Sequence, residues 1–138
     1  MSRKTDSNNP ADWIFIAESD LKGILLLIAQ ETSHALCVSK LAEIFEKILK
    51  AELIRIGWNL QKTHDLLKLG GEMRARGSDL TERIRPLCEF LAERYFTDRY
   101  PGFDLEDENW GALSVQADEI AALLKIVKGR IATSPPSP

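Results

Sequence analysis

Apolar residues recur at steps of three and four positions along most of the chain, which is the spacing of helices with one buried face. The first predicted helix begins at Trp13, with Asp12 as its cap. Its apolar stripe comprises Trp13, Ile16, Ala17, Leu21, Ile24, Leu25 and Ile28. No segment sustains the alternation of apolar and polar residues that is typical of a strand. The pattern therefore predicts an all-α protein.

Four further helices are expected. They run from a cap at Thr32 or Ser33 to about Gly57, from about Asp65 to about Arg74, from about Leu80 to residues 99–102, and from Ser114 to about Ile131. Either the pair Gly70–Gly71 or Gly77 ends the short third helix, because glycine destabilises helix interiors and often follows the end of a helix. Pro86 fits either a kink or the first turn of the fourth helix.

The four long helices predict an up-and-down four-helix bundle with an additional short helix. We expect this helical domain to span residues 12–132. Residues 1–11 are polar and are expected to form a flexible lead. Residues 133–138 are rich in serine and proline, a composition typical of disordered tails.

Charge and composition narrow the classes of function. The chain has 18 basic and 21 acidic residues among 138, a formal net charge of −3, which argues against strong nonspecific binding of nucleic acid. The longest apolar run, 23–29, is far shorter than the roughly 20 residues of a membrane span, and the polar start of the chain lacks a secretory signal. We therefore expect a cytoplasmic protein that makes no contact with a membrane.

Metal, cofactor and redox sites are not expected. The eight glycines form no phosphate-binding loop, and His34 and His64 stand thirty residues apart without ligand spacing. Cys37 and Cys88 are not closely spaced, and each lies in an apolar helical run. The two cysteines are therefore predicted to be buried, reduced thiols.

Two short segments carry candidate ligand-binding residues. Lys47 and Lys50 lie close to the apolar stripe of the second helix, where they either form a solvated face or hold an anion such as a nucleotide phosphate. His64 and Asp65 stand at the start of the third helix. They either cap this helix and make a local polar contact, or face a cleft in which the imidazole contacts a ligand or transfers protons.

A second candidate patch lies near the end of the fourth helix. Arg94 and Arg99 flank aromatic residues there, Tyr100 among them. The cations are explained by the helix dipole, or they grip a phosphate while the aromatic ring stacks on a base.

Four segments together resemble a HEPN domain. Residues 17–21 (A-E-S-D-L) are similar to the family's A-x-x-D-L opening, and residues 46–51 (E-K-I-L-K-A) to its E-K-x-L-K-A signature. Residues 63–69 (T-H-D-L-L-K-L) are similar to T-H-D-L-x-x-L, and residues 99–102 (R-Y-P-G) to the family's R-Y-P-G or R-Y-P-D. The resemblance covers residues 13–131 and rests on the order and helical setting of all four segments.

The resemblance implies an up-and-down helical bundle, usually a homodimer, with a role beside nucleotides or RNA. Many members accompany a minimal nucleotidyltransferase in a toxin–antitoxin-like context. Others are metal-independent ribonucleases with an arginine followed, after four to six residues, by a histidine. No arginine of this chain has a histidine at that spacing, and none follows Arg94 or Arg99. We therefore do not expect a ribonuclease of the family type.

These observations predict a non-catalytic binding module for a nucleotide or for a nucleotidyltransferase partner. Lys47 and Lys50 are the expected anion contacts, and His64 and Asp65 the expected polar centre. Two alternatives remain open: a metal-independent ribonuclease with an altered site around His64, and a structural bundle whose apolar helix faces bind another protein.

Overall fold

The computed structural model describes residues 7–97 and 108–133, and in these ranges it contains five helices and no strand. The helices are α1 (Pro10–Ala29), α2 (His34–Arg55), α3 (Leu66–Ala75), α4 (Thr81–Thr97) and α5 (Trp110–Thr133). The predicted all-α class is confirmed, as is the short third helix. Within the same ranges no helix is long and apolar enough to span a bilayer.

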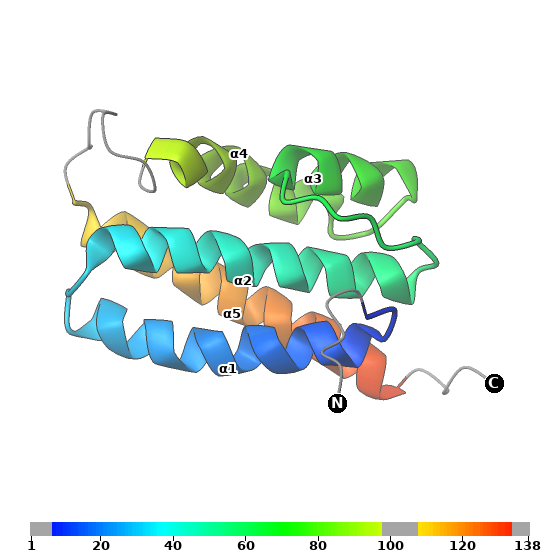
Figure 1. The fold of residues 1–138 in the computed structure, drawn as a ribbon, viewed down its shortest axis with the longest axis horizontal. Coiled ribbons are helices and arrows are strands. Elements are labelled where there is room, and N and C mark those ends of the chain that lie inside the picture. Colours follow the sequence, from blue (N-terminus) through cyan, green and yellow to red (C-terminus); the bar gives the residue numbers. More distant parts are fainter. Residues whose placement is uncertain (1–6, 98–107, 134–138) are drawn as a thin grey trace.

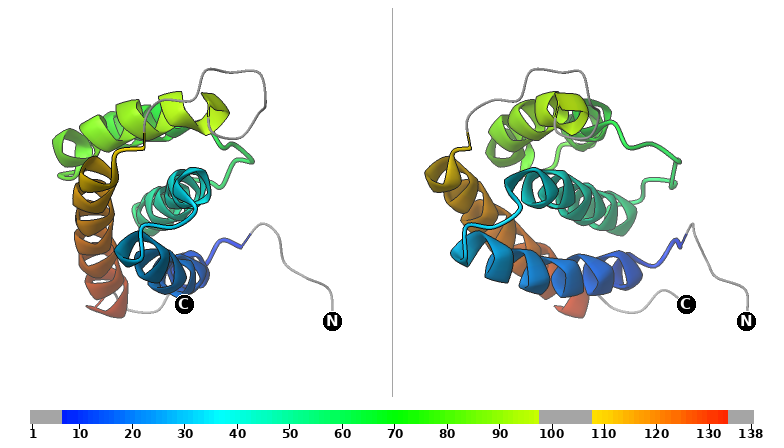
Figure 2. Two further views of the ribbon diagram at one scale, coloured as in Figure 1. Left: turned by 90° about the vertical axis from the view of Figure 1, so that its left-hand side faces the viewer. Right: turned by 60° about the vertical axis from the view of Figure 1, so that its left-hand side comes forward.

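Helix α2 lies at the centre of the bundle and contacts each of the other four helices. α1 runs along one side of α2, α3 and α4 cover the opposite side, and α5 packs against both α1 and α2 (Figures 1 and 2). α2 is therefore enclosed along most of its circumference, whereas α1 lies at the margin of the bundle.

The enclosure of α2 buries more of its surface than the sequence pattern indicates. The apolar residues at helical spacing are buried, namely Leu41, Ile44, Phe45, Ile48, Ala51 and Leu53, and so are Val38, Ala42 and Leu49. Three charged residues of this helix, Glu46, Lys50 and Glu52, are buried as well. A solvated face was one of the two interpretations of Lys50, and for this residue it is wrong because other elements cover that part of α2.

Helix α1 begins three residues earlier than predicted. Asn9, not Asp12, is the cap residue, and its side chain accepts a hydrogen bond of 3.0 Å from the backbone N–H of Ala11. Pro10 occupies the first helical position, where its missing N–H leaves no donor unsatisfied. Trp13 is therefore already one turn inside the helix.

The buried stripe of α1 also differs from the prediction at two positions, Ile14 and Ile16. Ile14 is buried at 5% exposure, whereas Ile16 is 44% exposed and lies outside the core. Ala17, Leu21 and Ile24 are buried as expected. The shift follows from the way α1 packs between α2 and α5.

The other helix starts are set by different caps. Ser33 precedes α2, as predicted, but makes no side-chain cap hydrogen bond, because its backbone is left-handed (φ 59°). α5 begins at Trp110, four residues before the predicted Ser114. The Asn109 side chain accepts a hydrogen bond of 2.9 Å from the N–H of the third residue of α5, and so caps this helix.

Of the two predicted ends of α3, the Gly70–Gly71 pair is wrong and Gly77 is confirmed. Both glycines lie inside the helix, and Gly77, with φ +69°, follows the end of α3. A Cβ atom at Gly70 would lie 3.1 Å from the Cys88 sulfur, so the missing side chain allows α3 to approach α4. Pro86 lies in the interior of α4 and not in its first turn.

Cys37 and Cys88 are free and buried, as predicted. Burial raises the pKa of both thiols, and together with the nearby carboxylate of Glu89 it raises the pKa of Cys88 to about 12. Both thiols are therefore protonated and unreactive in the folded protein.

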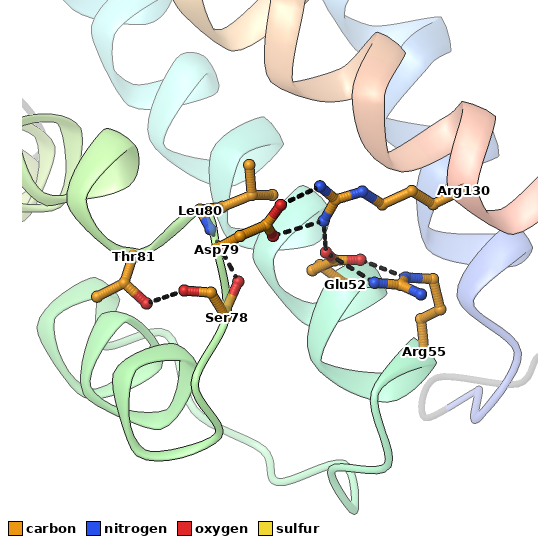
Figure 3. A network of polar contacts seen from close by, with 7 residues as sticks. All are labelled: Glu52, Arg55, Ser78, Asp79, Leu80, Thr81 and Arg130. Atoms are coloured by element: carbon orange, nitrogen blue, oxygen red, sulfur yellow. Dashed lines mark hydrogen bonds and ion pairs between the residues drawn. The ribbon is translucent and has the colours of Figure 1, made fainter.

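An ionic cluster joins the end of α2 to α5 and to the α3–α4 connection (Figure 3). Glu52, with its side chain 1% exposed, accepts hydrogen bonds from the guanidinium groups of Arg55 and Arg130. Arg130 also binds Asp79 through two hydrogen bonds, of 3.0 and 2.6 Å. In this Glu52 cluster, which comprises Glu52, Arg55, Asp79 and Arg130, each charged group has a partner of opposite charge. The cluster stabilises the contact between three elements.

Candidate anion-binding site

A pocket of about 360 Å³ opens beside the middle of α2. It is lined by Trp13 of α1, by Glu46, Lys47 and Lys50 of α2, and by Leu60, Gln61, Lys62 and His64 of the α2–α3 connection. Three lysines therefore face one glutamate around an aromatic ring. The pocket is locally basic on a chain whose net charge is −3.

The Glu46 carboxylate forms the floor of this pocket and binds two partners. Lys50 Nζ lies 2.9 Å from Glu46 Oε2, and the two side chains are 5% and 9% exposed. His64 Nδ1 lies 3.1 Å from both carboxylate oxygens, while the His64 side chain is 73% exposed. Because Nδ1 faces a carboxylate, it is the protonated nitrogen, and Nε2 remains available to a ligand.

Trp13 forms the wall of the pocket on the side of α1. Its indole nitrogen donates a hydrogen bond of 2.8 Å to the Ser7 carbonyl oxygen, which fixes the ring. Lys50 Nζ lies 5.2 Å from the centre of the ring, within the range of a cation–π contact. The charge of Lys50 is thus compensated by Glu46 and by the ring.

Lys47 and Lys62 differ from Lys50 in having no ion pair within residues 7–97 and 108–133. Lys47 is half-buried at the pocket and Lys62 is exposed. Among the described residues, two ammonium groups without an ion pair therefore line a pocket in which the charges of Glu46 and Lys50 balance each other. This arrangement is suited to an anion that arrives from solvent.

The structure brings together three of the four residues predicted on this side of the molecule: Lys47, Lys50 and His64. Asp65 does not line the pocket. Its carboxylate caps α3 by accepting hydrogen bonds from the backbone N–H groups of Leu67 and Lys68. This geometry agrees with the capping interpretation of Asp65.

The second predicted patch lies outside the described side chains. Arg94 belongs to α4 by its backbone, but its side chain is not described, and Arg99 and Tyr100 lie between the described ranges. The predicted role of these three residues remains a prediction.

Sequence interpretation missed five residues that line the pocket: Trp13, Glu46, Leu60, Gln61 and Lys62. Trp13 was assigned to the core stripe and Glu46 was given no role in ligand binding. The other three lie in the irregular α2–α3 connection, which has no periodicity. One signal was available for Glu46, which stands four residues before Lys50, within reach of an ion pair. The pattern contained no sign that other elements would cover this pair.

Comparison with known proteins identifies the family. The family model of the HEPN domain matches residues 10–129. No curated protein and no solved structure matches the chain. The match covers most of the chain and includes every residue of the pocket, in agreement with the resemblance found in the sequence. The chain therefore belongs to the HEPN domain family.

Proposed function

We propose that this protein is a cytoplasmic, non-catalytic binding module that holds a nucleotide by its phosphate in the pocket beside α2. The observation that carries the proposal is the pair Lys47 and Lys62, which have no ion pair with any described residue and line a pocket with an aromatic wall. The phosphate binds these two lysines, and His64 Nε2 contributes a hydrogen bond. Lys50 stays with Glu46 and shapes the interior.

The aromatic wall favours a nucleotide over a simple anion. Trp13 is partly exposed and its ring is held in place at Ser7, so a base can stack on it with little loss of conformational entropy. The lysines attract a phosphate only over a short range, because salt screens surface charges beyond about 8 Å. The net negative charge of the chain adds no long-range attraction. Binding is therefore expected to weaken as the salt concentration rises.

Isothermal titration calorimetry with ATP tests this proposal. ATP should bind at low ionic strength, and the double variant Lys47→Gln/Lys62→Gln should lower the affinity by at least about tenfold, since it removes both charge-assisted contacts. Lys125→Gln, an exposed lysine of α5 outside the pocket, is the matched control and should bind ATP like the wild type. Absence of heat with any common nucleotide, or equal loss in the control, would contradict the proposal.

The contact between His64 and Glu46 supports a second candidate function, the metal-independent cleavage of RNA. A carboxylate that holds Nδ1 leaves Nε2 free to accept the proton of a ribose 2′-hydroxyl, which is the task of a general base. Incubation of metal-free protein with single-stranded and structured RNA tests this function. Cleavage that disappears in His64→Ala would establish it in place of the non-catalytic role, whereas intact RNA would exclude it.

Membership of the HEPN family also supports two association partners: a minimal nucleotidyltransferase and a second copy of this chain. Co-expression with a nucleotidyltransferase encoded beside this protein tests the first. A complex that survives gel filtration at moderate salt would support it, and separate elution of the two proteins would contradict it.

A further inference from the structure

The imidazole of His64 is held through one of its two ring nitrogens. Nδ1 lies 3.1 Å from both oxygens of the Glu46 carboxylate, which Lys50 Nζ also binds at 2.9 Å. The second nitrogen, Nε2, makes no hydrogen bond with any described residue. Because the His64 side chain is 73% exposed and lines the pocket, Nε2 is the nitrogen that a ligand can reach.

The Glu46 carboxylate determines which nitrogen carries the proton when the ring is neutral. An ionised carboxylate only accepts hydrogen bonds, so Nδ1 has to be the donor. A neutral imidazole has a single N–H group, and its other nitrogen then carries a lone pair. Neutral His64 therefore offers a ligand an acceptor and not a donor.

A fully ionised phosphate also has only acceptor oxygens. A phosphate oxygen and the lone pair of Nε2 repel each other, so a hydrogen bond between them needs one more proton. This proton resides either on Nε2, which turns the ring into an imidazolium with two donors, or on the phosphate oxygen. In both cases the complex holds one proton more than the neutral ring and the ionised phosphate hold when separate.

The charges around the imidazole favour an arrival of this proton together with the phosphate. The charged residues that line the pocket with His64 are Glu46, Lys47, Lys50 and Lys62. α1 contributes only the uncharged Trp13, and the Asp65 carboxylate is bound to the N–H groups that it caps at α3. Before the ligand binds, a charged imidazole would add to three ammonium groups that face one carboxylate. A bound phosphate supplies negative charge that compensates the added proton.

We propose that phosphate binding in this pocket is coupled to the uptake of one proton at the contact with His64, so that the affinity for a nucleotide rises as the pH falls. The inference rests on the proposed nucleotide binding and adds its regulation by pH. A proton that is held in the complex and not in the free protein favours binding at lower pH, and this gain is lost as the pH rises. Affinity for ATP should fall at least about threefold between pH 7 and pH 8.5.

Calorimetry of ATP binding at pH 7.5 in HEPES and in Tris counts the protons, because the two buffers absorb different heats when they release a proton. The phosphates of free ATP are already ionised at this pH. The wild type should take up about half a proton or more. His64→Asn should bind ATP without proton uptake. His34→Asn changes the other histidine, which packs against Trp110 outside the pocket, and is the matched control that should keep the wild-type uptake.

Glu46→Gln tests the cause of the coupling. The glutamine amide is able to donate to Nδ1, so a neutral ring can carry its proton on Nε2 and donate it to the phosphate. This variant should bind ATP with less than about half of the wild-type proton uptake, and its affinity should change less than about twofold between pH 7 and pH 8.5.

The outcomes separate the coupling from nucleotide binding itself. ATP binding with the same enthalpy in both buffers would overturn the coupling and leave the proposed function intact. Uptake that persists in His64→Asn, or that is undiminished in Glu46→Gln, would have the same meaning. Absence of ATP binding by the wild type would overturn both the coupling and the proposed function.

Discussion

Helix α2 carries two buried glutamates six residues apart, and their roles differ. Glu52 joins elements of the fold, whereas Glu46 lines the candidate anion-binding pocket. The Glu52 carboxylate is 1% exposed and is shared by two guanidinium groups, one of which also binds Asp79 (Figure 3). The Glu46 carboxylate is almost as buried, but it binds one buried lysine and one exposed imidazole at the floor of a pocket.

The surroundings of the two glutamates differ in whether nearby cations are left without an acidic partner. Around Glu52 each described cation has an acidic partner, and the cluster joins α2, α5 and the α3–α4 connection. Around Glu46 the charges of Glu46 and Lys50 balance each other, whereas Lys47 and Lys62 have no ion pair in the part of the chain that the structure describes. A buried carboxylate therefore does not by itself mark a binding site; the uncompensated charge beside it does.

The largest expected effect comes from opening the Glu52 cluster. Arg55→Met/Arg130→Met leaves a buried carboxylate without its cations and should lower the free energy of unfolding by about 3–5 kcal/mol, measured by urea denaturation. ATP affinity should stay within twofold. Arg83→Met, which breaks the exposed Arg83–Glu119 pair, is the control and should cost less than about 1 kcal/mol. A double variant as stable as this control would remove the distinction between the two clusters.

The second expected effect concerns Glu46, where one substitution should lower the stability of the protein and raise its affinity for ATP. Glu46→Gln leaves the buried Lys50 ammonium without its carboxylate and should lower the free energy of unfolding by about 2 kcal/mol. The same change removes the one acidic residue among those lining the pocket, so ATP affinity should rise about three- to tenfold in calorimetry. Glu52→Gln should destabilise the protein without this gain. Weaker binding in Glu46→Gln would show that the carboxylate contacts the ligand.

A smaller effect is expected at His64. The side chain is 73% exposed, so His64→Asn should change the free energy of unfolding by less than about 0.5 kcal/mol. ATP affinity should fall about two- to fivefold, because one hydrogen bond is lost. Asp65→Asn keeps the cap of α3, lies outside the pocket and should change neither quantity. Equal effects in both variants would argue against a ligand contact by His64.

The smallest effect is a dependence on pH in the Glu52 cluster. The hydrogen bonds from Arg130 hold the pKa of Asp79 below its ordinary value of 3.8. A depressed folded pKa adds stability above the unfolded pKa, and this stability is lost as the pH falls through the folded pKa. Between pH 5 and about pH 3, Asp79→Asn should therefore lose less unfolding free energy than the wild type. Parallel curves would show that the pair contributes nothing, as for many exposed pairs.

The sequence was sufficient to predict the class of fold. The helical spacing of apolar residues predicted the five helices, since this period depends only on which face is buried. The helix starts were less predictable: Asn9 caps α1 in place of the predicted Asp12, and α5 begins four residues before Ser114 with Asn109 as its cap. Several nearby residues are able to cap a helix, and tertiary packing selects among them. Gly70 was misinterpreted because its contact with Cys88 depends on how α3 meets α4.

The pocket was predictable only in part. Lys47, Lys50 and His64 were identified from short segments that resemble the family's motifs, and they do meet in space. Trp13 was not identified because it comes from α1, which only the folded chain brings to this part of α2, and Lys62 because no periodic pattern marks it in the α2–α3 connection. The burial of Glu46 was not predicted because the pattern of a single helix does not show how many neighbours enclose it.

The central place of α2 also determines how the molecule opens. Since α2 contacts all four other helices, no single neighbour can detach and free its backbone. Its amide hydrogens should therefore exchange with deuterium at the rate of global unfolding, whereas those of the marginal helix α1 exchange through partial opening. The pocket residues of α2 thus belong to the part of the protein that opens only on global unfolding. Trp13 of α1 belongs to a part that opens locally.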